Sequence, residues 1–191
     1  EINAFYGSNA KHSSSYGRII NQRHSQRLVN ALAGQNVIYG GDYDTQQRYL
    51  SPTLVLNPKH QTTLMQEEIF GPILPILSTT GRAQMIDHVK QGEKPLALYS
   101  FAKDDQFNDT VVSAISAGNV CINDGMMFMA NHHLPFGGVG QSGMGRYGGY
   151  YGFETFSHVK SVMKRYFFAD VALRYPPFSQ KKMRWMKRIL G

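Results

Sequence analysis

A chain of 191 residues with 42% hydrophobic residues is long enough to bury the core of an ordinary domain. Its aromatic fraction of 12% argues against intrinsic disorder. The formal net charge of +7 does not indicate a nucleic-acid-binding protein, because most of the excess lies at the C-terminal end and no basic stripe runs through the body of the chain. The basic residues of that end are Lys181, Lys182, Arg184, Lys187 and Arg188.

One cysteine cannot form an internal disulfide, which fits a reducing compartment. No apolar run approaches the length of a membrane span, and the first residues do not resemble a signal peptide. We therefore expect a cytoplasmic protein, with membrane association through its basic tail left open.

Hydrophobic periodicity predicts strands that alternate with helices along most of the chain. The expected helices are residues 21–33, 81–91, 104–118 and 180–190, after a short helix end at 1–6. The expected strands are 37–39, 49–56 with an interruption at Pro52, 73–77, 96–101, 120–122 and 154–163. The strand at 96–101 is apolar on both faces, as buried parallel strands are. The sequence therefore predicts an α/β fold with a mostly parallel sheet flanked by helices.

Residues 67–72 (EEIFGP) bring two carboxylates, an aromatic ring and a turn together. If this segment is extended, Glu68 and Phe70 lie on the same face. Gly71 would allow a close backbone approach or an unusual φ, and Pro72 would set the exit direction. A carboxylate beside an aromatic side chain suits a ligand in which a sugar with two neighbouring hydroxyls is attached to a flat ring. The alternative is a strand end with a solvated pair of acids.

Four ordered segments resemble the aldehyde dehydrogenase superfamily and, by their spacing, its class 3 branch of fatty, aromatic and coniferyl aldehyde dehydrogenases. They are residues 65–72 (MQEEIFGP), 134–145 (LPFGGVGQSGMG), 153–158 (FETFSH) and 174–177 (RYPP). The resemblance extends over essentially the whole chain, although members of the family are more than twice as long. It implies that this chain is the C-terminal portion of such an enzyme. The nucleophilic cysteine and the general base would then lie outside it, so no catalytic residue is expected within it.

The resemblance implies NAD or NADP as cofactor and an aldehyde as substrate. The complete enzyme would oxidise the aldehyde through a cysteine thiohemiacetal. Three parts are expected: a partial catalytic domain (1–152), an oligomerisation strand (153–168) that supports a homodimer, and a tail with a basic amphipathic helix (169–191).

The same resemblance assigns roles to individual residues. Glu68 would bind the hydroxyls of the nicotinamide ribose, and Phe70 would support the nicotinamide side. Met126, Met129 and Phe136 would line the substrate pocket. Because that wall is apolar, we expect medium-chain, long-chain or aromatic aldehydes.

Three other candidate sites are rejected on sequence grounds. Residues 138–143 match G-x-G-x-x-G, but they lack the strand before and the helix after that a dinucleotide loop needs. Cys121 lies within an apolar strand and is interpreted as a structural residue. His132 and His133 are adjacent and lack a cluster of further ligands, so we predict no metal site.

The predicted C-terminal helix is amphipathic. Its basic residues are set against an apolar group of Met183, Met186, Ile189 and Leu190. It could pack on its own domain or on a dimer partner, which we favour, or lie on an anionic membrane. For the whole chain, two alternatives to the enzyme remain. One is a catalytically inactive binding or scaffold module with the same fold, and the other is a peripheral membrane protein that uses its tail.

Overall fold

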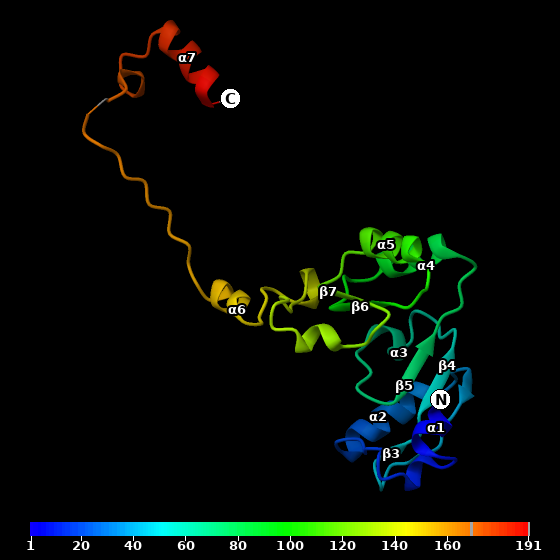
Figure 1. Cartoon of the computed structure of the whole chain (residues 1–191). Helices are drawn as coiled ribbons and strands as arrows, with labels where there is room; N and C mark the ends of the chain where they lie inside the picture. Colours follow the sequence, from blue (N-terminus) through cyan, green and yellow to red (C-terminus); the bar gives the residue numbers. More distant parts are fainter. Residues whose placement is uncertain (169, 191) are drawn as a thin grey trace.

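The computed structural model describes residues 1–168 and 170–190 (Figure 1). The α-helices are α1 (Ile2–Tyr6), α2 (Gln22–Leu32), α3 (Thr63–Gln66), α4 (Arg82–Gln91), α5 (Asp105–Ala114), α6 (Tyr150–Thr155) and α7 (Gln180–Leu190). The strands are β1 (Val37–Tyr39), β2 (Tyr43–Asp44), β3 (Tyr49–Leu50), β4 (Thr53–Leu56), β5 (Ile73–Ile76), β6 (Ala97–Ser100) and β7 (Asn119–Ile122). Short 3₁₀ turns are η1 (Ala10–His12), η2 (Met127–Ala130), η3 (Gly140–Ser142) and η4 (Ala172–Arg174). Among the described residues, no helix combines the length and the apolar character that a bilayer span requires.

The first half of the chain builds a three-stranded sheet in the order β1-β4-β5. β4 runs parallel to β5 and antiparallel to β1, with a bulge in the pairing with β1. The interruption predicted at Pro52 is confirmed, because the chain leaves the β2-β3 hairpin there and enters β4. Pro75 lies in β5, at the edge of the sheet, where a missing backbone N–H is tolerated.

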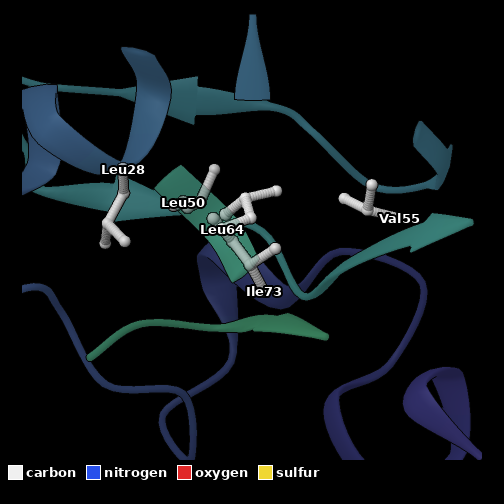
Figure 2. Packing of buried hydrophobic residues seen from close by; sticks show 5 residues of the cluster. All are labelled: Leu28, Leu50, Val55, Leu64 and Ile73. Atoms are coloured by element: carbon white, nitrogen blue, oxygen red, sulfur yellow. The ribbon is translucent and has the colours of Figure 1, made fainter. Parts of the chain in front are cut away.

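One hydrophobic core lies between this sheet, the hairpin and the helices α2 and α3. Figure 2 shows its five buried side chains: Leu28 of α2, Leu50 of β3, Val55 of β4, Leu64 of α3 and Ile73 of β5. The start of α2 is defined by Asn21, whose side-chain oxygen accepts a hydrogen bond of 2.7 Å from the His24 backbone N–H. This predicted cap fixes the first turn of α2, and Leu28 marks the face that points inward.

A second core joins β6 and β7, which pair in parallel, to the helices α4 and α5. Ile86 of α4 packs with Val111 of α5 and with Ile115, the residue that directly follows α5, as their helical spacing predicts. The buried Asn108 accepts a hydrogen bond of 2.7 Å from the Ser100 hydroxyl, which ties α5 to the end of β6. The helix ends at Ala114, four residues before the predicted end at Gly118.

The α/β class is confirmed, but the sheet is more divided than the sequence indicated. The strands form three small sheets, with two parallel and two antiparallel pairings among the described residues. The strands are only two to four residues long, so each offers few backbone N–H and C=O groups for pairing. In addition, the turn at residues 45–48 folds β2 directly back on β3, so these two strands pair with each other.

The strand predicted at residues 154–163 is not formed within the described chain. Helix α6 extends to Thr155, whose hydroxyl donates a hydrogen bond of 2.9 Å to the Tyr151 carbonyl. Residues 157–166 then follow an extended path away from the sheets and belong to no strand (Figure 1). Aromatic and β-branched residues favour a strand, but a strand also needs a partner edge, and none of the described strands supplies one.

Candidate functional site

The loop between α3 and β5 lies against one face of α2. His24 Nε2 lies 2.8 Å from the carbonyl oxygen of Phe70. Three residues further along the helix, the Arg27 guanidinium donates hydrogen bonds to the carbonyl oxygen of Glu68, at 3.4 Å, and to that of Ile69. Since positions three apart share a helix face, α2 presents both side chains to consecutive carbonyls of this loop.

The loop approaches α2 so closely that a side chain at residue 71 would displace part of the core. A Cβ at Gly71 would lie 2.4 Å from Leu28 Cδ1, and Leu28 is itself buried in the core. The predicted close approach is therefore confirmed. The positive φ lies instead at Phe70, at 49°, a conformation that a bulky residue rarely adopts. Strain of this kind collects at functional sites, because the surroundings must enforce it.

The expectation that extended alternation aligns Glu68 with Phe70 is wrong. Residues 67–70 are not a strand, and the left-handed turn at Phe70 ends any alternation. Hydrogen bonds from α2 to the carbonyls of this loop override the local pattern. Glu68 and Phe70 nevertheless lie two residues apart on one loop, and both are exposed.

The two neighbouring acids have different surroundings. The Glu67 carboxylate lies 3.3 Å from the Arg27 guanidinium and forms an ion pair with it. Among the described residues, the Glu68 carboxylate has neither an ion pair nor a hydrogen-bond donor. Because Glu67 occupies the nearby arginine, Glu68 remains available to an outside ligand.

A groove of about 750 Å³ opens beside this loop. Its lining is cationic and apolar, without an acid: Arg18, Ile19, Ile20, Asn21, Arg23, His24, Arg27 and Phe70. Phe70 is 69% exposed, so its ring is free to contact a ligand. Glu68 does not line this groove and lies further back on the same loop. Such a lining can accept an anionic ligand with a flat ring.

The residues predicted for a substrate pocket gather around β6 and β7. Phe136 stacks on Phe128 at a centroid distance of 5.8 Å, and Phe128 stacks on Tyr99 of β6 at 5.8 Å. Met126 and Met129 lie within two residues of Phe128 along the chain and are 61% and 47% exposed. The structure thus places Phe136 in an aromatic cluster and leaves the two methionines accessible.

The glycine-rich segment after Phe136 folds back on itself. Phe136 and Tyr147 exchange two backbone hydrogen bonds of 2.8 Å, which close the segment at its base. Inside it, a Cβ at Gly138 would lie 2.2 Å from the Ser142 backbone. The three-residue turn η3 stands where a dinucleotide loop would begin its helix, which supports the rejection of the G-x-G-x-x-G match.

Cys121 lies in β7, half-buried, with its backbone paired in register with Tyr99 of β6. This position agrees with a structural cysteine.

Sequence reasoning missed His24 and Arg27, which form the second half of the candidate site. We predicted a helix at residues 21–33 but no site residue within it. The available signal was the spacing of His24, Arg27 and Leu28, which places a cation beside the core residue on one face. The contact with the 67–71 loop, however, is a long-range one that no local pattern contains.

Comparison with known proteins decides the family. Residues 4–162 match the model of the aldehyde dehydrogenase family. The chain belongs to this family. It is 45% identical over 185 residues to "Aldehyde dehydrogenase, dimeric NADP-preferring" of Canis lupus familiaris. It is 44% identical over 191 residues to "Aldehyde dehydrogenase family 3 member A2" of Mus musculus. The class 3 resemblance is thereby confirmed.

A solved structure supports the same assignment. The "Substrate bound state of Staphylococcus Aureus AldH" matches with a TM-score of 0.82 and 41% identity, over 100% of this chain and 42% of that one. The alignments cover 96% of this chain and 41% of the dog protein, and 99% of this chain and 40% of the mouse protein. The chain therefore spans about two fifths of the length of these relatives.

Proposed function

We propose that this aldehyde dehydrogenase chain is the C-terminal portion of a class 3 enzyme that uses NAD or NADP to oxidise aldehydes to carboxylic acids. The nucleophilic cysteine and the general base of the thiohemiacetal route would lie outside these residues. The observation that carries the proposal is the difference between two adjacent acids. Glu67 forms an ion pair with Arg27, whereas Glu68 is exposed and unpaired among the described residues, two positions before Phe70.

The residues present fit the ribose and ring of a nicotinamide dinucleotide. An exposed carboxylate can accept hydrogen bonds from two neighbouring hydroxyls, as an acid does for the other ribose in dinucleotide folds. Phe70 offers an exposed aromatic face, and the groove beside it carries arginines suited to phosphate. A bound dinucleotide would supply the hydride acceptor.

In this scheme the chain contributes positioning. Glu68 would orient the ribose, and Phe70 would limit the movement of the attached ring. His24 and Arg27 would hold the loop that carries both, through its carbonyl oxygens. Orientation matters because a small misplacement of reacting atoms slows a reaction strongly.

The substitution Glu68→Gln in the complete enzyme tests this role. Because a neutral amide holds a hydroxyl pair less firmly, we expect single-turnover NADH or NADPH formation to slow by about tenfold or more. Aldehyde binding, measured separately, should change little. The matched control is Glu93→Gln, which removes an exposed acid outside this loop that forms no ion pair among the described residues, and it should leave the rate unchanged. Equal rates in Glu68→Gln and in the unmodified enzyme would remove the proposed role.

We also propose that the natural substrate is a medium-chain, long-chain or aromatic aldehyde. The exposed Met126 and Met129 beside the aromatic stack support this preference, since methionine adapts to varied apolar ligands. The ratio of kcat/KM for decanal and acetaldehyde, measured on the complete enzyme, should greatly favour decanal. Met129→Gln should reduce that ratio, whereas Met144→Gln, at a fully exposed methionine outside the stack, should not. A ratio near one would contradict the proposal.

We further propose a homodimer that uses residues 153–168. Phe156, Val159 and Met163 are between 87% and 92% exposed, and an extended apolar segment can pair with the sheet edge of a second copy. The dog relative is named as dimeric. Sedimentation of the complete enzyme should show a dimer, and Val159→Lys with Met163→Lys should shift it to monomer. Lys59→Glu with Lys90→Glu, at exposed positions elsewhere, is the control.

A further inference from the structure

Both parallel strand pairs described above end in a similar asparagine arrangement. Asn57 directly follows β4 and Asn123 directly follows β7, and both have a positive φ, at 48° and 57°. The Asn57 backbone N–H donates a hydrogen bond of 2.7 Å to the carbonyl of Ile76, the last residue of the partner strand. Its side-chain oxygen accepts a hydrogen bond of 2.7 Å from the Ser78 backbone N–H, two positions further on. We call this arrangement an asparagine clamp.

The clamp at Asn123 makes more contacts than the clamp at Asn57. The Asn123 backbone N–H donates to the carbonyl of Ser100, the last residue of β6, at 2.8 Å. Its side-chain amide binds both backbone groups of Ala102: Oδ1 accepts from the N–H at 2.9 Å, and Nδ2 donates to the carbonyl oxygen at 2.9 Å. The buried Asn108 of α5 donates to the same carbonyl at 3.1 Å. Asn123 therefore ties the end of β7 to the end of β6 and, through Ala102, to a helix.

Asn123 lies where a ligand site is expected. Open α/β sheets bind ligands beyond the carboxyl ends of their strands, and Asn123 is the first residue beyond that end of β7. The segment that begins there contains the η2 turn, which contacts β7. Phe128 of this turn stacks on Tyr99 of β6. The segment thus returns over the two strands whose ends Asn123 joins.

We propose that Asn123 is a positioning residue for aldehyde selectivity, an inference that rests on the substrate class proposed above. The positive φ turns the chain out of β7, and the two hydrogen bonds to Ala102 fix the direction in which residues 124–130 leave the strand. That direction determines where the exposed side chains of Met126 and Met129 lie. Asparagine suits this task, because it tolerates a left-handed backbone and its amide both donates and accepts hydrogen bonds.

The substitution Asn123→Gly in the complete enzyme tests this role, because it removes the amide but keeps a positive φ accessible. We expect kcat/KM for decanal to fall about tenfold more than kcat/KM for acetaldehyde, since misplacing an apolar wall affects mainly the aldehyde long enough to touch it. The matched control is Asn57→Gly, because the chain after Asn57 leads to α3 and not to the aromatic stack. It should leave the ratio for the two aldehydes unchanged. An unchanged ratio in Asn123→Gly, or the same loss in Asn57→Gly, would overturn the inference.

Two further measurements separate this inference from the proposed substrate class. Amide hydrogen exchange of residues 124–130 should become faster in Asn123→Gly but not in Asn57→Gly, whichever aldehyde the enzyme prefers. A missing decanal preference in the unmodified enzyme would contradict the substrate class alone, whereas unchanged exchange in Asn123→Gly would contradict the positioning role. Asn123→Ala should reduce the ratio at least as much as Asn123→Gly does. A loss confined to the alanine variant would assign the effect to the positive φ instead of the amide and would also overturn the inference.

Discussion

The two ends of this chain treat the same residue types in opposite ways. In the body, Val55 is completely buried between α2, α3 and the strands, whereas in the tail Val159 is 89% exposed. Phe107 packs against the second core, whereas Phe156 is 92% exposed. The difference shows that apolar composition does not decide burial. A segment is buried when the remainder of the fold offers it a complementary surface, and residues 156–190 find none within the described chain.

The largest effect should follow from the same substitution made in both regions. Val55→Ala removes two methyl groups from a closed core and should lower the free energy of unfolding by about 2.5 kcal/mol. Val159→Ala should change it by less than about 0.5 kcal/mol. Urea unfolding of the chain measures both. Similar losses for the two variants would mean that the tail packs on the body in solution.

A smaller loss is expected from Gly71→Ala, about 2 kcal/mol, because the new Cβ would press on Leu28 in the core. Gly17→Ala is the control, since nothing lies within 4 Å of a Cβ at that position. Combining Gly71→Ala with Leu28→Ala should cost less than the sum of the two single losses, because the shortened side chain leaves room for the methyl group. Strict additivity would show that the two positions do not touch.

Arg27→Met should lower the free energy of unfolding by about 1 kcal/mol, because the carbonyls of the 67–71 loop lose a charged donor. Amide hydrogen exchange of residues 67–71 should increase as well. The control Arg23→Met removes an equal charge from the same groove but no hydrogen bond found among the described residues. If both variants loosen the loop equally, net charge rather than hydrogen bonding holds it.

A pH effect should arise from Asp44 in the hairpin of the body. A hydrogen bond of 2.9 Å from Lys11 lowers the pKa of the Asp44 carboxyl below its usual value, and backbone donors of Gln47 and Gln46 act in the same direction. Since the folded pKa is lower than the unfolded one, this contribution is complete above the unfolded pKa and is lost as the pH falls through the folded pKa. Asp44→Asn should therefore flatten the acidic limb of the stability profile, measured by urea unfolding at a series of pH values. An unaltered limb would show that other carboxylates dominate it.

The smallest expected effect is that of deleting residues 157–191. Because neither core contains a residue from this segment, the free energy of unfolding of the body should be unchanged within about 0.5 kcal/mol. Thermal unfolding followed by circular dichroism near 222 nm is a suitable measurement, after allowance for the lost signal of α7. A markedly less stable truncated chain would place the tail among the structural parts of the body.

Local patterns determined much of this protein. The cap at Asn21 and the stripes of α4 and α5 follow from hydrogen-bonding needs and helical spacing that act within a few residues. The order of the EEIFGP and glycine-rich segments was enough to indicate the family. Local chemistry also separated the apolar and basic sides of α7, since both depend only on residues within the helix.

Tertiary structure decided the matters that depend on distant partners. Which of two adjacent acids is neutralised depends on Arg27, forty residues away along the chain from Glu67. Phe70 leaves the extended pattern because helix α2 holds the carbonyls around it, and residues 157–163 remain outside any strand because no described edge receives them. The physical reason is the same in each case: hydrogen bonds and burial need two partners, and the sequence near one partner does not specify where the other lies.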